Sequence, residues 1–320
     1  MSAVKNLIAS LLFSSVIVVL ATGCGYSQEQ QPVWAYPVNP PNFQRSSDDG
    51  SIRHVPGSTA GFTLTEVRDL FSTPDWHPEE HPPMPKIVAV GRKPGVFACG
   101  VCHRADGPGG PESSSLFGLS AEYIIQQTQE FRTGQRSGSA SRVPTDLMIK
   151  ESKAVTDQEL AEAAAYFSAV RPRANLTVLE ADTVPRTEVR ELFLTPVAGT
   201  EQEPIGQRII ELPESLEDYI SRDSHARFVA YVPRGSIEKG KTLATTRDTQ
   251  CATCHGEGLR GTDLAPRIAG RSPTYLFRQL YDFKSGARNG TNSGLMKPIV
   301  EPLSINDMIA LAAYAGSLAP

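Results

Sequence analysis

The sequence predicts an all-α protein built from two copies of one helical domain. A shift of 152 residues lays Cys251 on Cys99, and seven matches follow in register: Gly118, Ser120, Tyr123, Phe131, Gly134, Arg136 and Gly138 meet Gly270, Ser272, Tyr275, Phe283, Gly286, Arg288 and Gly290. Further on, a shift of 148 residues aligns Ala164–Tyr166 with Ala312–Tyr314. A duplicated domain explains this register, and the change of four residues predicts one shorter loop before Met296.

Each copy carries the start and stop signals of helices, and neither shows the alternation typical of strands. Ser120 and Ser272 are suitable N-cap residues, and Gly134 and Gly286 follow as stops. Aromatic residues and glutamine recur at helical spacing between them. The last helix of each copy opens with a capping box, at residues 156–159 and 304–307.

The composition is that of a soluble globular protein. The chain has 320 residues, 40% of them apolar, and a formal net charge of -4. This length allows two domains of ordinary size, and the charge balance argues against nucleic-acid binding.

Two C-x-x-C-H strings predict covalent haem attachment. Two thiols one helical turn apart can add to the two vinyl groups of a porphyrin, and the following imidazole can bind the iron. The alternatives are a thioredoxin-like redox pair or half of a zinc site. A redox pair has no need of the histidine, and a zinc site would want a second cysteine pair nearby. The residues concerned are Cys99, Cys102 and His103 in the first copy and Cys251, Cys254 and His255 in the second.

Both copies resemble class I cytochrome c domains, and the pair is similar to the dihaem cytochrome c4 type. The resemblance covers residues 86–172 and 233–320. Besides the two C-x-x-C-H strings it rests on Ala265–Gly270, Tyr275, Phe283, Gly286, Arg288, Met296 and Ala312–Tyr314. It implies an all-α fold around each of two covalently bound haem c groups, with methionine as the sixth iron ligand.

Met148 and Met296 are the candidates for that sixth ligand. They lie 45 and 41 residues after their histidines, and each precedes a capping box by eight residues. A methionine is more often core filler, but the duplicated position and a turn expected at Lys297-Pro298 favour a ligand. A neutral thioether suits low-spin haem iron, and His/Met ligation raises the reduction potential.

The two sites differ in their supporting residues. In the family resembled, a proline carbonyl accepts the hydrogen bond of the proximal histidine, and Pro266 holds that position. Ser114 stands there in the first copy, and Arg104 replaces the glycine found at Gly256. We therefore expect two haems of the same kind at different potentials.

The start of the chain predicts export and lipid anchoring. Lys5 precedes an apolar run, Leu7–Ala21, that is too short for a comfortable membrane span. Leu20–Cys24 resembles a bacterial lipoprotein box, in which Cys24 would be acylated, and an ordinary secretory signal is the alternative. Cys24 is also the one cysteine of five outside the haem motifs, and an odd thiol in an exported protein calls for an explanation.

The remaining segments complete the predicted organisation. The boundaries are a signal peptide (1–23), a polar tether (24–58), a first cytochrome c domain (59–172), an interdomain linker (173–232) and a second cytochrome c domain (233–320). The linker is long and partly irregular, with apolar runs at residues 209–212 and 228–232 that could pair as short strands. The four histidines outside the motifs are interpreted as solvated loop residues, with a surface metal bound by His77 and His81 as the alternative.

These features favour an electron carrier over an enzyme. Two six-coordinate haems leave no open iron for a substrate, and one-electron exchange at a haem edge needs none. The expected partners are redox proteins of a respiratory chain: a dehydrogenase or reductase, and a terminal oxidase or another cytochrome. The expected location is the periplasmic side of a bacterial membrane, reached through the lipid anchor. The alternative is a haem subunit of a dehydrogenase complex or a dihaem oxidoreductase such as a peroxidase.

Overall fold

The computed structural model describes residues 31–246 and 249–320, so the predicted signal and Cys24 lie outside the described residues. The chain divides into an N-terminal unit, Met1–Pro32, and a second unit, Val33–Pro320, which is the one described here. Within the described ranges, no helix has both the length and the apolar character needed to cross a membrane.

The first cytochrome half is helical. Its elements are α1 (Leu64–Arg68), α2 (Lys86–Ala89), α3 (Cys99–His103), α4 (Ala121–Arg132), α5 (Val143–Ala154) and α6 (Asp157–Ala169). Helix α6 packs against α2 and α4 around a core that contains Phe117, Ile124 and Phe167. The C-x-x-C-H string therefore forms a short helix of its own at the edge of this core.

The second half repeats this order. Its elements are α8 (Ser236–Thr245), α9 (Cys251–His255), the 3-10 helix η2 (Glu257–Leu259), α10 (Pro273–Ser285), α11 (Ser293–Val300) and α12 (Ile305–Ser317). Helix α12 packs against α8 and α10, and its Met308 is fully buried in the core. Helix α11 has 8 residues where α5 has 12, so the four-residue deletion involves this helix as well as the loop before it.

The predicted helix signals are confirmed. Ser120 and Ser272 accept hydrogen bonds from the third residue of α4 and α10, and Gly286 ends α10 in the left-handed conformation. Both capping boxes form, at the starts of α6 and α12. These short-range signals are correct because each is satisfied within one turn of chain.

The all-α prediction is wrong for the segment between the halves. Residues 176–233 contain seven strands: β1 (Leu176–Ala181), β2 (Thr183–Pro185), β3 (Thr187–Arg190), β4 (Phe193–Pro196), β5 (Gln202–Pro204), β6 (Ile210–Pro213) and β7 (Phe228–Pro233), with α7 (Leu216–Ile220) between β6 and β7. Strand β7 is central, pairing with β1 in parallel and with β6 antiparallel. The predicted pairing of the two apolar runs is thus confirmed. We call residues 173–232 the insert.

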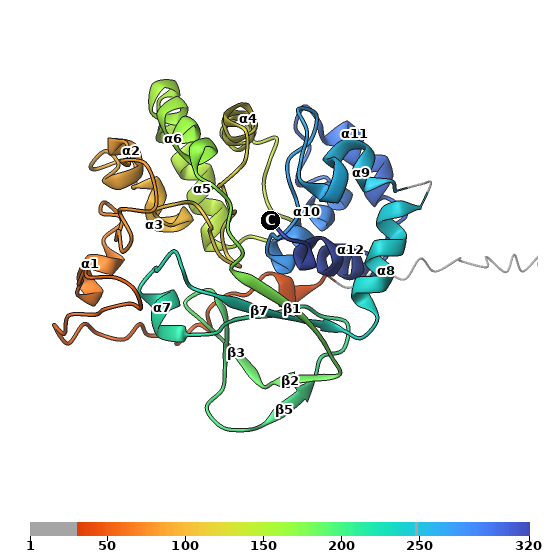
Figure 1. Cartoon of the computed structure of the whole chain (residues 1–320), viewed down its shortest axis with the longest axis horizontal. Helices are drawn as coiled ribbons and strands as arrows, with labels where there is room; N and C mark the ends of the chain where they lie inside the picture. The colour runs from red at the N-terminus through yellow and green to blue at the C-terminus, as the bar shows by residue number, and fades with distance from the viewer. Residues whose placement is uncertain (1–30, 247–248) are drawn as a thin grey trace, which may run out of the picture. The chain divides into compact units, whose positions relative to one another are not determined.

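The insert is built into both halves. In Figure 1, β1 and β7 run from the side of α7 towards α8 and α12. Ala230 and Val232 of β7 belong to the core of the second half, and α12 packs on β1. At the other end Ser221 accepts a hydrogen bond from Trp76 of the first half at 2.8 Å. The segment is therefore an integral layer of the fold, where the sequence predicts a linker.

Part of the predicted polar tether is also packed. Val33–Ala35 forms the 3-10 helix η1, and both Ala35 and Tyr36 are buried in the second half's core. The ring of Trp34 lies 4.6 Å from that of Phe277, centroid to centroid. Trp34, Ala35 and Tyr36 thus anchor this otherwise polar segment to the second half.

Candidate haem-attachment sites

Helices α3 and α9 present the two thiols and the imidazole of each motif on a single turn. All four cysteines are half-buried and form no disulfide. Burial raises the pKa of Cys99 to about 12 and raises the pKa of Cys102 and Cys251 as well. Redox pairs and zinc sites use the thiolate, so the burial of Cys99, Cys102 and Cys251 favours neither alternative.

Each proximal histidine is oriented by a main-chain carbonyl. Nδ1 of His255 donates to the carbonyl of Pro266 at 2.7 Å, as the resemblance implies. Nδ1 of His103 donates to the carbonyl of Ser114 at 2.8 Å, so a serine serves as well because the acceptor belongs to the backbone. Burial lowers the pKa of both imidazoles. Each histidine is thus neutral, with its proton on Nδ1 and the lone pair on Nε2.

The residue after each histidine has the same unusual backbone. Arg104 has φ 69° and ψ 163°, and Gly256 has φ 76° and ψ 173°. This region is almost exclusive to glycine and costs other residues about 1–3 kcal/mol. Arg104 keeps it through its side chain, which is 4% exposed, lies over the Tyr219 ring at 5.1 Å and pairs with Glu112 at 3.6 Å.

The two candidate methionine ligands lie on equivalent helices. Met148 is half-buried on α5, and Met296 is half-buried on α11, packed against the core of the second half. The turn expected at Lys297-Pro298 is not formed, because both residues lie inside α11. Pro298 has no N–H group to donate, so this two-turn helix lacks one of its i to i−4 hydrogen bonds at that position.

Four buried guanidinium groups have unpartnered nitrogens that suit the carboxylates of a haem. Among the described residues, Nε and Nη2 of Arg142, Nε and Nη2 of Arg267, Nη2 of Arg271 and Nε of Arg288 have no hydrogen-bond partner. Burial lowers the pKa of Arg142 to about 9 and that of Arg267 to about 10. A buried cation needs a counter-charge, and haem propionates would supply it. The residues present therefore fit a haem at each motif.

The two halves meet directly in a pseudo-symmetric hydrogen-bond network. Arg136 donates to Tyr275 Oη at 3.1 Å and to Gln279 Oε1 at 2.8 Å. The equivalent Arg288 donates to Tyr123 Oη at 2.7 Å and to Gln127 Oε1 at 2.6 Å. Each arginine thus binds the tyrosine and glutamine of the opposite copy. The helical periodicity of these residues suggests core packing, and only the folded pair reveals their role.

A second symmetric pair closes the same interface. Glu130 accepts a hydrogen bond from the Thr291 amide at 3.1 Å, and its equivalent Asp282 accepts one from the Ser139 amide at 2.9 Å. A Cβ atom on Gly290 would lie 2.0 Å from the Glu130 carboxyl carbon, so glycine is required for this approach. The two halves are therefore joined by direct hydrogen bonds despite the long insert.

The insert covers the first motif. Arg222, which follows α7, donates to the carbonyl of Val101, and burial lowers its pKa. Gly100 and Val101 are buried, whereas the equivalent Ala252 and Thr253 of α9 are exposed. In Figure 1, α7 lies on the side of α3, and no part of the insert is drawn against α9. The motifs match in sequence and local geometry but differ in access.

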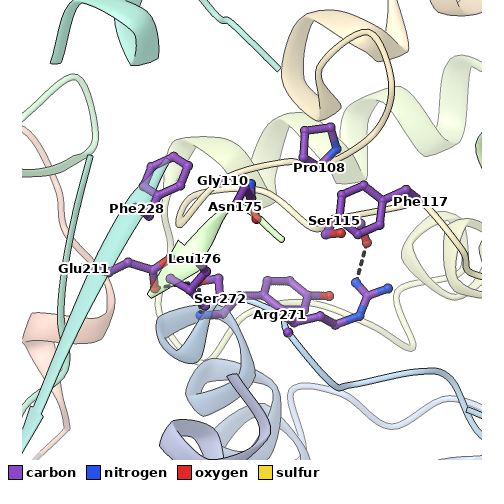
Figure 2. Close-up of a pocket in the computed structure, with 12 residues that line it drawn as sticks. Pro108, Gly110, Ser115, Phe117, Asn175, Leu176, Glu211, Phe228, Arg271 and Ser272 are labelled. Atoms are coloured by element: carbon purple, nitrogen blue, oxygen red, sulfur yellow. Dashed lines mark hydrogen bonds between the residues drawn. The ribbon is translucent and has the colours of Figure 1, made fainter. Parts of the chain in front are cut away.

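A pocket marks the junction of the three parts (Figure 2). It is lined by Ser115 and Phe117 of the first half, Glu211 of the insert, and Arg271 of the second half, among others. Arg271 donates to the Ser115 carbonyl across the junction. Glu211 accepts from Ser272 Oγ at 2.7 Å, and burial raises its pKa. The pocket walls are thus tied together by bonds between all three parts.

Comparison with known proteins gives a family and two sets of relatives. The cytochrome c family model matches residues 94–170 and 237–319, half of the chain. Cytochrome c4 of Azotobacter vinelandii is 26% identical over 228 residues, covering 69% of this chain and 84% of that protein. The thiosulfate dehydrogenase electron acceptor of Stutzerimonas stutzeri strain A1501 is 25% identical over 227 residues, covering 70% of this chain and 80% of that protein.

A solved structure of thiosulfate dehydrogenase from Marichromatium purpuratum matches with a TM-score of 0.48 and 25% identity. The match covers 71% of this chain but 38% of that one, so this chain spans well under half of that protein. The two family matches coincide with the two halves, each with its own C-x-x-C-H helix. The chain belongs to the cytochrome c family, with two cytochrome c domains and two covalently bound haem c groups.

Proposed function

We propose that the chain is an electron-transfer protein that passes single electrons between redox partners. One observation carries this: two equivalent sites each hold a neutral histidine by its Nδ1, at 2.8 and 2.7 Å from a carbonyl, and lie in halves joined by direct contacts. Haem iron supplies a one-electron couple when bound. The residues around it set its ligands, its counter-charges and the access of partners.

His103 with Met148, and His255 with Met296, are the proposed iron ligands. The cysteines Cys99, Cys102, Cys251 and Cys254 hold the haem edges. A thioether in the sixth position raises the reduction potential and leaves no open coordination site for a substrate. Arg142 and Arg267 are the buried cations proposed to pair with the haem propionates.

Partners exchange electrons at the second site in this proposal. Ala252 and Thr253 of α9 are exposed, and so is Leu264, at 57%, in the loop that Thr262 ties to the Cys254 carbonyl at 2.6 Å. An accessible haem edge beside an apolar side chain suits a transient protein contact. The first site, covered by the insert, then receives electrons through the interface between the halves.

A dehydrogenase is the proposed donor, in keeping with relatives named as thiosulfate dehydrogenase electron acceptors. A terminal oxidase or another cytochrome is the proposed acceptor. The proposed location is the periplasmic side of a bacterial membrane, with acylated Cys24 as the anchor. The same relatives make a permanent haem subunit of a dehydrogenase complex the second candidate, and co-purification with a catalytic subunit would favour it.

Optical redox titration tests the proposal. The wild-type protein should show two low-spin haems, and the methionine–iron absorption should fall by half in each of Met148→Ala and Met296→Ala. Met84→Leu, a half-buried methionine outside both sites, is the matched control and should leave it unchanged. High-spin iron in the wild type, or turnover of peroxide, would contradict a pure electron carrier.

A further inference from the structure

Three metal-ligating side chains meet where the insert joins the first half. His77 and Glu80 lie in the proline-rich loop before α2, and His225 lies in the turn between α7 and β7. One ligand atom of each lies within 4.8 Å of the other two. His77 and His225 are thus not the solvated loop residues that the sequence suggests: His77 is 3% exposed and His225 is half-buried.

A single carboxylate positions both histidines. Oδ1 of Asp223 accepts a hydrogen bond from Nε2 of His77 at 3.1 Å and from the backbone N–H of His225 at 2.9 Å. Because the carboxylate accepts, the proton of His77 sits on Nε2 and Nδ1 carries the lone pair. A carboxylate behind a ligating histidine is the usual outer partner at metal centres.

The charges facing the cluster favour a dication. Glu80 Oε2 lies 2.8 Å from Nε2 of His225. Asp223 adds a second carboxylate. Among the described residues, Arg173 forms an ion pair with Glu80, 3.9 Å from its Oε2, and its guanidinium is also bound to Asp106. Two carboxylates against one shared guanidinium leave the cluster net negative.

One imidazole must turn for both to ligate. The two rings are stacked, with centroids 3.7 Å apart and planes 8° from parallel. A metal ion in the plane of one ring would therefore lie outside the plane of the other. The His225 side chain is 32% exposed and can rotate, whereas that of His77 is 3% exposed and fixed. For the neutral His225 imidazole to ligate through Nε2, its proton would move from Nε2 to Nδ1, so the ion would take the place of the hydrogen bond to Glu80 with no net release of a proton.

We propose that His77, Glu80 and His225 form a binding site for a divalent transition-metal ion of the zinc type. Two imidazoles and one carboxylate suit Zn²⁺, with water in the fourth position, while calcium and magnesium prefer more oxygen ligands. The ion would fasten the loop of the first half to the turn of the insert, beside the bond from Trp76 to Ser221. The site thus stabilises the part of the insert that covers α3, namely α7 and Arg222.

Zinc titration of the chelator-treated, haem-loaded full chain tests this. Calorimetry should find one Zn²⁺ per chain, and X-ray absorption at the zinc edge, which haem iron does not obscure, should find two imidazole ligands. His225→Ala and Glu80→Gln should each weaken binding at least tenfold, and Asp223→Asn should weaken it about 10- to 100-fold. Zinc should raise the unfolding temperature of the wild type and not that of His225→Ala.

His54→Ala is the matched control, since this loop histidine lies outside the cluster and contacts the Ala60 carbonyl. It should bind zinc as the wild type does. An intact haem spectrum and circular dichroism show that the partly exposed Glu80 and His225 variants are folded, so the outcome does not depend on His77. Binding unchanged in both variants, binding lost equally in His54→Ala, or oxygen-only coordination would overturn the proposal.

Discussion

The two C-x-x-C-H helices are alike in chemistry and unlike in surroundings. Both histidines donate to a main-chain carbonyl, at 2.8 Å in the first site and 2.7 Å in the second. The middle of α3 is buried under the insert, and the middle of α9 is exposed. Residues outside the repeat therefore decide which site a partner can reach. The two copies of the domain have equivalent histidine geometry, and the insert between them makes the exposure of the two motifs different.

Removing each haem in turn is expected to give the largest difference. Cys251→Ala with Cys254→Ala should abolish rapid electron exchange with a monohaem cytochrome c used as probe, because the covered first site remains. Cys99→Ala with Cys102→Ala should retain rapid exchange. Stopped-flow spectroscopy measures both rates, and a haem assay confirms one haem per chain. Equal loss in the two variants would show that access does not separate the sites.

Loosening the part of the insert that covers α3 tests the same difference in access between the two sites. Tyr219→Ala removes a buried aromatic side chain and should lower the free energy of unfolding by about 3–5 kcal/mol. Hydrogen exchange should then accelerate at the amides of α3 and stay unchanged in α9. Tyr231→Ala, on β7, is the control and should destabilise the insert without exposing α3. Unchanged protection of α3 in Tyr219→Ala would contradict the covering role.

The backbone after each histidine gives a smaller effect. Gly256→Ala should destabilise the second half by about 1–3 kcal/mol, because its φ of 76° is unfavourable for alanine. The new Cβ would also lie 2.8 Å from the Gly261 carbonyl oxygen. Gly294→Ala, where no atom lies within 4 Å, should be neutral or slightly stabilising in denaturant unfolding. If Gly256→Ala left the free energy of unfolding unchanged, the backbone conformation that Gly256 shares with Arg104 would not be strained in Arg104 either.

Substitutions in the two capping boxes are expected to give the smallest change in the free energy of unfolding, and this change should depend on pH. The hydrogen bond from Arg92 lowers the pKa of Glu159 from 4.5 to about 2. A carboxyl group whose pKa is lower when folded stabilises above its unfolded pKa and loses this as pH falls towards 2. Glu159→Gln should therefore cost about 1 kcal/mol at pH 7 and less at pH 3, measured by urea unfolding.

Asp307→Asn is the matched change in the second half, where Lys239 takes the place of Arg92 at 2.8 Å. It should cost a similar amount at pH 7. A Glu159→Gln cost that did not shrink at low pH would show that the ion pair with the half-exposed Arg92 contributes nothing.

The sequence predicts what depends on neighbours along the chain. The helix caps, the capping boxes and the carbonyl of Pro266 are correct because each is read within about a dozen residues. Because of the internal repeat, a signal recognised in one half also predicted the equivalent element in the other half. Serine at position 114 in place of proline does not remove the acceptor, since a backbone carbonyl is present whatever the side chain.

Contacts between distant segments escaped prediction. Gln127 and Arg136 look like ordinary helix and loop residues until the opposite copy is present. The docking of the insert rests on single side chains such as Tyr219 and Arg222, which follow no period. His225 is separated by 145 residues from Glu80, its partner, so no spacing rule links them. These contacts arise between segments that are distant in the sequence, and no local sequence pattern encodes them.

The contacts that close the insert over α3 join residues that lie far apart in the sequence. Arg222 binds the Val101 carbonyl across 121 residues, and Trp76 binds the Ser221 carbonyl across 145. Contacts of such large sequence separation form slowly, because a long loop must close before they are made. We therefore expect the first half to complete its packing only after the insert has folded.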